Sequence, residues 1–372
     1  MNEIAQVIAR SRTTAVDELQ KIGRVRIKVL GLGGGGSNAV NRMIELGLAD
    51  VDFIAANTDK QALASSLAPC QIQLGPRVTR GLGAGGDSRV GASAAMESSR
   101  ELAAALRQAD MVFITAGMGG GTGTGAAPVA AEIAREIGAI VIAIVTLPFA
   151  FEMNRRAQNA LDGVKRLQPH THTLITVPND RLLQVVPHDL SLEIAFRLAD
   201  DVLRQGVQGI AELITRPGLI NVDFAHIRQL MMNGGGAFMS IGLGEGPEKA
   251  KAAIHQALNH PLLEINSLEQ ASGILVHFTG GADLTLHEVG EAVTELRQSL
   301  APDTDLILGA TSEEIMTGRA QVILIVTGIG GRPIGMLNTI ETDTRLLSVE
   351  QVSSVGDDLD LPTFLRKRAS IG

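Results

Sequence analysis

The stretch GMGGGTGTG, residues 117–125, determines how the rest of the sequence is interpreted. Six of its nine residues are glycine, although one or two glycines suffice for a tight turn and each loses much backbone entropy on folding. The stretch follows the apolar run MVFITA and precedes the helical pattern AAPVAAEIARE. A glycine-rich turn from strand to helix presents bare backbone N–H groups at a helix N-terminus, so we expect a phosphate-binding loop. The hydroxyls of Thr122 and Thr124 can add hydrogen bonds to phosphate or to a metal.

A second glycine-rich stretch, GLGGGGSN at residues 31–38, follows the apolar run RIKVL. Its Gly31, Gly33 and Gly36 match G-x-G-x-x-G, and Asp52 lies at about the distance of a ribose contact. That match alone favours a nicotinamide-dependent oxidoreductase. However, a dinucleotide fold requires neither the extra glycines nor a second phosphate-type loop. G-x-x-x-x-G-K-[ST] is also absent from the sequence, so a nucleoside triphosphate held by two glycine loops fits better.

Apolar runs alternate with helical patterns over most of the chain. Near-continuous runs such as ADMVFITAG (109–117) and AIVIAIVTLP (139–148) predict a parallel sheet covered on both faces. A long helix is expected over about residues 190–214. Four further runs follow, from AFMSIGLG (237–244) to AQVILIVTG (320–328), and predict a second, smaller α/β domain.

Composition excludes several classes of function. The chain has 372 residues, a net charge of -8 and 2% aromatic residues, with neither Trp nor Tyr. A nucleic-acid binder needs positive potential or aromatic stacking platforms, so none is expected. The single Cys70 excludes an internal disulfide, and the longest uncharged apolar run, residues 137–151, is too short to span a bilayer. His170 and His172 have no accompanying Cys cluster, so no metal site made by protein ligands alone is expected.

The motifs together resemble the FtsZ family, the bacterial tubulin-like GTPases of cell division. Besides GMGGGTGTG, the resemblance is carried by GGGGSNAVNRM (33–43), NTD (57–59), GLGAGGD (81–87), PFAFE (148–152), PNDRLL (178–183) and QGIAELITRPGLINVDFA (208–225). It runs from about residue 26 to 328 and resumes near the C-terminus. It implies a tubulin/FtsZ-like α/β fold, in which a long central helix joins a parallel-sheet nucleotide-binding domain to a smaller α/β domain.

The resemblance implies GTP as ligand, with Mg²⁺ bound together with its phosphates. Backbone donors would wrap the phosphates at Gly34, Gly35, Gly36, Ser37, Asn38, Gly121, Thr122 and Gly123. Glu152 would accept hydrogen bonds from the ribose, Arg156 would support the nucleotide, and Phe196 would lie against the guanine. Asp200 would accept from the guanine N1–H and exocyclic amine. Met153 stands where the family has glycine after the glutamate.

The resemblance also implies boundaries along the chain. They are an N-terminal helical extension (1–24), a GTP-binding domain (25–195), a central connecting helix and loop (196–220), a C-terminal α/β domain with an interface loop (221–330), a linker (331–357) and a partner-binding peptide (358–372). The peptide LDLPTFLRKR (359–368) would bind membrane-anchored division proteins. Its anchoring residues would be Leu361, Pro362, Phe364, Leu365 and Arg366. The expected location is the cytoplasm at the division site, without direct membrane insertion.

The loop NVDFAHI (221–227) departs from the family pattern. In the family this loop reaches the GTP of the next subunit, so the active site is complete only in a head-to-tail homopolymer. Asp223 is retained, whereas His226 replaces a second acidic residue. Both are candidate catalytic residues, because an imidazole can still orient or deprotonate water. The main interpretation is a polymerising GTPase, weakened by His226. The alternative is a structural polymer that hydrolyses GTP slowly or not at all.

Overall fold

The computed structural model describes residues 25–329, apart from residues 153, 185–190, 217, 221, 233–234, 264–267 and 269–270. The strands are β1 (Ile27–Leu32), β2 (Asp52–Asn57), β3 (Cys70–Gln73), β4 (Met111–Gly117), β5 (Ile140–Leu147), β6 (Thr173–Pro178), β7 (Gly235–Glu245), β8 (Gly273–Gly280), β9 (Asp305–Ser312) and β10 (Arg319–Thr327). They form one sheet in the order β3-β2-β1-β4-β5-β6-β7-β10-β8-β9.

The helices lie on both faces of this sheet. They are α2 (Gly33–Glu45), α3 (Lys60–Ala64), α4 (Ser88–Glu97), α5 (Ser99–Leu106), α6 (Thr122–Glu136), α7 (Asn154–Leu167), α8 (Asn179–Leu182), α9 (Leu192–Thr215), α10 (Phe224–Met232), α11 (Lys249–Leu258) and α12 (Leu286–Gln298). No helix in the described part of the chain has the length and apolarity needed to cross a membrane.

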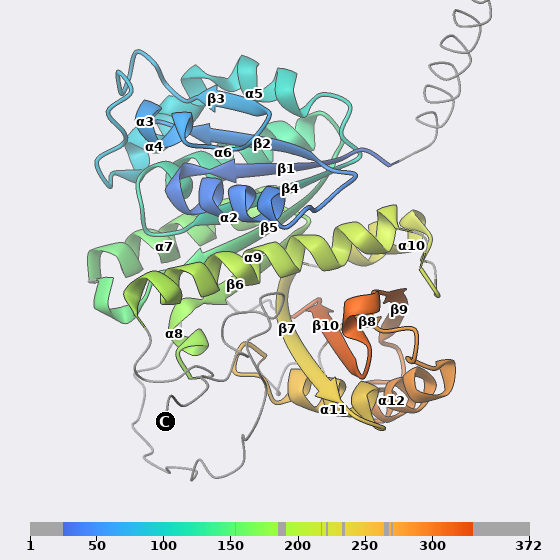
Figure 1. Cartoon of the computed structure of the whole chain (residues 1–372). Helices are drawn as coiled ribbons and strands as arrows, with labels where there is room; N and C mark the ends of the chain where they lie inside the picture. The colour runs from blue at the N-terminus through green and yellow to red at the C-terminus, as the bar shows by residue number, and fades with distance from the viewer. Residues whose placement is uncertain are drawn as a thin grey trace, which may run out of the picture.

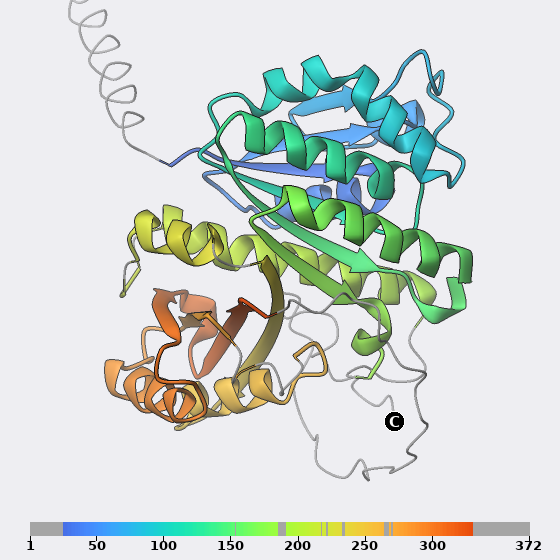
Figure 2. The same ribbon diagram turned by 180° about the vertical axis from the view of Figure 1, so that it is seen from behind.

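The first six strands are all parallel, as their continuous apolar runs predict. Helices α2 and α9 cover one face, and α4 to α7 cover the other (Figures 1 and 2). Successive residues of a strand point to opposite faces. Phe113 accordingly joins the core under α2 and α9, whereas Ile114 joins the core under α6. The expected parallel, doubly covered sheet is confirmed.

The last four strands form a mixed sheet, with β10 antiparallel to both β7 and β8. Helices α11 and α12 share the core on one of its faces. On the other face, Ile323 and Ile325 of β10 join the core that contains α9. Parallel pairing of β6 with β7 makes the sheet continuous between the two halves. The domain boundaries given by the resemblance stay a prediction.

The break between α4 and α5 and the short strand β3 differ from the sequence expectation. The stretch AAMESSRELAAALRQA (94–109) has one continuous helical pattern, but the chain leaves the helix at Ser98 and starts again as α5. The Ser98 hydroxyl donates to the Gln73 carbonyl oxygen at 3.2 Å and accepts from the Gly75 N–H at 3.0 Å. These bonds tie the break to β3, a short strand that no apolar run had marked.

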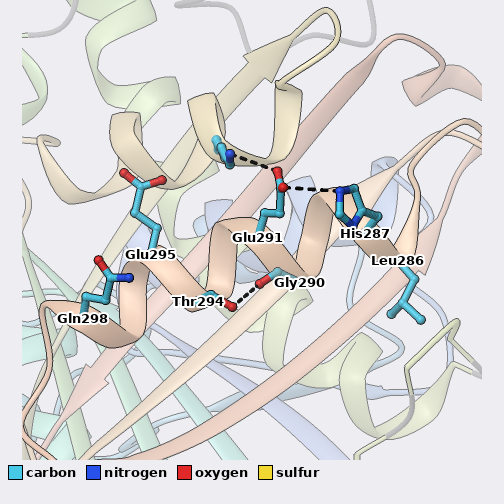
Figure 3. A pocket seen from close by; sticks show the side chains of 8 residues that line it. Leu286, His287, Gly290, Glu291, Thr294, Glu295 and Gln298 are labelled. Atoms are coloured by element: carbon cyan, nitrogen blue, oxygen red, sulfur yellow. Dashed lines mark hydrogen bonds and ion pairs between the residues drawn. The ribbon is translucent and has the colours of Figure 1, made fainter.

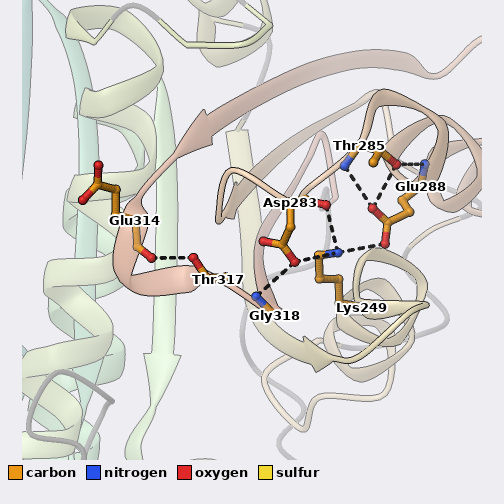
Figure 4. A network of polar contacts seen from close by, with 7 residues as sticks. All are labelled: Lys249, Asp283, Thr285, Glu288, Glu314, Thr317 and Gly318. Atoms are coloured by element: carbon orange, nitrogen blue, oxygen red, sulfur yellow. Dashed lines mark hydrogen bonds and ion pairs between the residues drawn. The ribbon is translucent and has the colours of Figure 1, made fainter.

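Lys249, the first residue of α11, is almost completely buried. Its Nζ lies 3.0 Å from Glu288 Oε1 and 3.3 Å from Asp283 Oδ2, and Glu288 also forms the capping box of α12 with Thr285. Figure 4 shows these contacts together with the hydrogen bond from Gly318 N–H to Asp283. The network fixes the starts of α11 and α12 relative to the turn before β10.

Candidate nucleotide-binding site

The two glycine-rich stretches lie next to each other in the structure. Strand β1 leads directly into α2, and its parallel neighbour β4 leads through residues 118–121 into α6. Both helices therefore begin at the carboxyl edge of the sheet, where ligands bind in open α/β folds. The first turns of α2 and α6 contain no acidic residue and receive no side-chain cap. Their unpaired N–H groups and positive dipole ends are suited to a polyphosphate.

The glycines divide into packed and open positions. A Cβ on Gly33 would lie 2.9 Å from the Gly123 nitrogen, and one on Gly36 would collide with the Thr115 carbonyl oxygen. These glycines are therefore needed for close backbone packing. At Gly34 and Gly120, by contrast, a Cβ would meet nothing within 4 Å. A phosphate can approach the backbone at these two open positions. Gly120 was not among the residues predicted from the sequence.

The polar residues beside the glycines are arranged unequally. Asn38 is exposed, one turn after Gly34, whereas Ser37 is buried and its hydroxyl has no partner among the described residues. The Thr122 hydroxyl pairs with that of Thr58 at 2.6 Å. Thr124 is fully buried and accepts from the Gly119 N–H at 2.8 Å. Thr124 thus stabilises the loop itself.

A third glycine-containing segment, residues 81–87, lies against the second loop. A Cβ on Gly121 would lie 2.8 Å from Ala84 Cβ and 3.1 Å from the Gly86 nitrogen. Gly85 and Gly86 have φ values of 58° and 77°, which other residues rarely adopt. Sequence reasoning quoted this segment as a motif but assigned it no role. The adjacent Gly85 and Gly86 were the signal in the sequence by which a role for this segment could have been predicted.

Three phenylalanines gather where the base is expected. Phe149 stacks on Phe151 with a ring-centroid distance of 5.0 Å, and Phe196 meets Phe149 edge-on at 5.4 Å. Phe196 and Phe151 stay partly exposed, so an apolar ring surface remains open. Nearby, Glu152 accepts from the Phe149 N–H at 2.9 Å and pairs with Arg156. Glu152 and Arg156 thus lie together beside the aromatic cluster.

Asp200 and Asp201 are neighbours in sequence but have different surroundings. Asp201 accepts from Arg204 Nε at 2.7 Å and from Gln205 Nε2 at 2.6 Å. No hydrogen bond or ion pair reaches the Asp200 carboxylate from the described residues. Burial, and to a smaller extent the charge of Asp201, raises the pKa of Asp200 to about 7. Asp200 lies one turn after Phe196 on the same side of α9, so we expect its open carboxylate near the aromatic rings.

Asp223 and His226 lie at the other end of α9. Asp223 Oδ1 accepts from the Ala225 N–H at 3.0 Å, so Asp223 caps the start of α10. Asp223 and His226 are both exposed and lie three residues apart. Figure 1 shows α10 at the end of the molecule opposite to the edge where α2 begins. Helix α9 has 24 residues, which corresponds to about 36 Å. One chain therefore cannot bring Asp223 to its own glycine loops.

The remaining sequence hypotheses give a mixed result. Asp52 lies at the start of β2, 4.0 Å from Lys28 and away from the carboxyl edge, so it does not fit the ribose contact of a dinucleotide fold. No group of three or more His, Cys, Asp or Glu residues suited to a metal ion occurs in the described residues. Met153 and the tail residues Leu361, Pro362, Phe364, Leu365 and Arg366 lie outside the described residues.

A surface depression of about 860 Å³ lies on α11 and α12, away from the glycine loops. Figure 3 shows Glu291 of this depression paired with His287 and with a lysine of α11. Glu291 lies 2.9 Å from Lys251 and 3.3 Å from His287, and Glu295 lies 2.9 Å from His255. The charges of this depression are thus satisfied within the chain, and it lacks the backbone donors of the glycine loops.

Comparison with known proteins agrees with this geometry. The profile of the Tubulin/FtsZ family, GTPase domain, matches residues 26–187, and that of the FtsZ family, C-terminal domain, matches residues 235–330. An empty FtsZ dimer from M. jannaschii is similar, with 44% identity and a TM-score of 0.81 over 87% of this chain and 93% of that chain. Fold and glycine loops define a tubulin-like GTP-binding protein. The chain belongs to the Tubulin/FtsZ family, which confirms the resemblance drawn from the motifs.

More distant structures share the fold. The GDP-bound monomer of CetZ1 from Haloferax volcanii is 20% identical, with a TM-score of 0.70 over 83% of this chain and 96% of that chain. The GTPγS-bound protofilament of CetZ2 from the same organism is 21% identical, with a TM-score of 0.66 over 82% of this chain and 94% of that chain. The same arrangement of sheet and helices is therefore found in proteins with only 20–21% sequence identity to this chain.

The two kinds of glycine predict different effects of substitution. Gly36→Ala places a methyl group against the Thr115 carbonyl, and we expect the nucleotide-free protein to lose about 1–3 kcal/mol of unfolding free energy. Gly34→Ala meets open space, so its effect on unfolding is expected to stay within about 1 kcal/mol. Urea denaturation measures both. If Gly36→Ala is as stable as the wild type, the packing of α2 against β4 does not require glycine at position 36.

Proposed function

We propose that this protein binds GTP at the paired glycine loops and polymerises head to tail, with hydrolysis at the contact between subunits. The phosphates would be held by backbone N–H groups at Gly34, Gly35, Gly36, Ser37, Asn38, Gly121, Thr122 and Gly123, to which we add the open Gly120. Mg²⁺ would be bound mainly by the phosphate oxygens, since it takes few protein ligands in such sites.

The base and ribose would lie between the aromatic cluster and the start of α9. Phe196 offers an apolar face, and Asp200 a carboxylate with no competing donor among the described residues. Guanine presents two adjacent donors, N1–H and the exocyclic amine, whereas adenine presents an acceptor at N1. An open carboxylate at this position therefore favours guanine. Glu152 and Arg156 would contact the ribose side.

The observation that carries the proposal is the separation of the two halves of the site. The glycine loops and the exposed pair Asp223 and His226 lie at opposite ends of α9, a helix about 36 Å long. A second subunit has to supply the missing half. Such a contact joins two different surfaces, so it repeats without closing and generates a filament.

Exposed apolar residues near both ends support such a contact. Leu82 is 84% exposed beside the loop at 84–87, and Phe151 is 55% exposed in the aromatic cluster. At the other end, Leu219 is 63% exposed in the segment before Asp223. A contact between the two ends would cover these exposed side chains. The dimer and protofilament named for the related structures are consistent with self-association of this chain, and assembly into a cytoplasmic division ring is the role we propose.

A mixing experiment tests the shared site. Asp200→Ala should impair the nucleotide side of a subunit, and Asp223→Ala should impair its loop side. Each variant alone is expected to hydrolyse GTP at a small fraction of the wild-type rate. An equimolar mixture should regain a measurable part of that rate, because an intact loop then meets an intact nucleotide site. Phosphate release that never exceeds the mean of the two separate variants would contradict a site built from two subunits.

Hydrolysis is expected to depend on His226. A positioned acid–base group contributes about 10²–10⁴-fold, and the imidazole replaces one of two acidic groups expected in this loop. His226→Asp should raise phosphate release per polymerised subunit and shorten filament lifetime, without changing the amount of protein sedimented early after GTP addition. Turnover that is the same in both proteins would show that histidine is a full substitute. Near-zero wild-type turnover with normal sedimentation favours the slow structural polymer.

The C-terminal peptide is proposed to bind a membrane-anchored partner. Residues 358–372 lie beyond the described chain, and they combine the apolar Leu361, Phe364 and Leu365 with the basic Arg366. Deletion of residues 358–372 is expected to leave GTP-dependent sedimentation intact and to abolish recruitment to membranes carrying the division partners. Deletion of the equally long stretch 335–349 in the linker is the control. Loss of sedimentation in the first deletion alone would place the peptide in the polymer contact.

A further inference from the structure

Arg204 has two carboxylates within reach on α9. It lies four residues after Asp200 and three after Asp201, and both spacings allow an ion pair on a helix. At 100° per residue, Arg204 is about 40° around the axis from Asp200 and about 60° from Asp201. Helix geometry alone therefore gives Asp201 no advantage over Asp200.

The structure pairs Arg204 with Asp201 and holds that pair in place. Arg204 Nε lies 2.7 Å from Asp201 Oδ1, and the other end of the guanidinium donates to Gln208. The second oxygen of Asp201 accepts from the buried Gln205, whose own oxygen accepts from Gln321 of β10 at 3.0 Å. Contacts with β10 thus hold Gln205, and through it Asp201, in an arrangement that keeps Arg204 on Asp201.

We propose that Asp201 is a positioning residue for guanine selection: by holding Arg204, it leaves both oxygens of Asp200 open to the two donors of the base. This inference rests on the proposed binding of guanine at Asp200 and adds the reason why that carboxylate is open. Without Asp201, Arg204 would pair with Asp200 and occupy the acceptors that the base needs.

The charge state of Asp200 makes the inference measurable. Burial and the charge of Asp201 raise the pKa of Asp200 to about 7. A protonated carboxyl has lost its charge and carries an O–H donor on one oxygen, so its two oxygens no longer match the two donors of guanine, and guanine recognition should weaken as the pH falls from 8 to 6. The elements that pack against α9 carry other charged residues: Arg42 and Glu45 on α2, Asp180 and Arg181 on α8, Asp305 on β9 and Arg319 on β10. Burial and Asp201 are the causes that shift the pKa of Asp200.

The experiment compares GDP with inosine diphosphate, which lacks the exocyclic amine. Titration of the diphosphate cancels in the ratio of their dissociation constants, so the ratio reports base recognition. In the wild type we expect GDP to bind about 10–100-fold more tightly at pH 8, the effect of one hydrogen bond to a charged acceptor. This preference should decline toward pH 6. In Asp201→Asn it should fall to about threefold or less at every pH, because Arg204 then pairs with Asp200.

Two further variants separate positioning from a structural effect. Arg204→Met should keep the preference for GDP and move its loss to higher pH, because the negative charge of Asp201 beside Asp200 then loses its cation. The double variant Asp201→Asn/Arg204→Met should regain the preference that Asp201→Asn lacks. A preference in Asp201→Asn that equals the wild type at pH 6 and pH 8 would overturn the inference, as would failure of the double variant to recover it. If the Asp200→Ala variant binds GDP as tightly as the wild type does, the proposed base site itself is overturned.

Discussion

Packing of α9 against both halves of the sheet is the constraint on which the rest of the structure depends. A Cβ on Gly206 would lie 2.8 Å from the Met239 sulfur and 3.0 Å from Ile144 Cδ1, so strands of both halves approach the helix at one glycine. Leu203, Val207 and Ile210 are fully buried between them. Burial of each such side chain contributes about 1.5–3 kcal/mol. The helix is thereby fixed as a rigid spacer between the nucleotide end and the loop end.

The polar residues on this packed helix show why Asp200 is distinctive. Glu212 is also buried, and burial raises its pKa, but Gln208 donates to it at 2.8 Å and Arg216 pairs with it at 3.0 Å. Asp201 is equally provided with donors. A buried charge without a partner destabilises a fold, so an open carboxylate persists where a ligand supplies the missing donors. This contrast supports the proposed role of Asp200 in binding, because Asp201 and Glu212 already receive donors from the chain itself.

The sequence predicted the strands well, because strands buried on both faces must be apolar throughout. It also singled out the two glycine-rich loops, because so many glycines exceed what a turn requires, and their phosphate-binding role stays a prediction. It did not reveal β3, whose CQIQ is half polar, nor the break at Ser98, which depends on hydrogen bonds to residues far along the chain. The choice of Arg204 between two carboxylates also could not be predicted, because both spacings are favourable on a helix and the contact with Gln321 comes from β10.

The close approach of the two glycine loops explains why so much backbone entropy is given up there. Gly33 lies against Gly123 and Gly121 against Ala84, so side chains are excluded where three segments meet. What remains at the surface is backbone N–H from two helix starts, neither of which has an acidic residue in its first turn. Partial positive charge is thereby concentrated at one edge, which suits the polyphosphate of the proposed ligand. The loop end has the opposite character, since it carries the exposed Asp223 carboxylate, which accepts from the Ala225 N–H at the start of α10. Within one chain α9 keeps the glycine edge and the Asp223 turn at opposite ends of a 24-residue helix, so the proposed shared site needs one of them from each of two subunits.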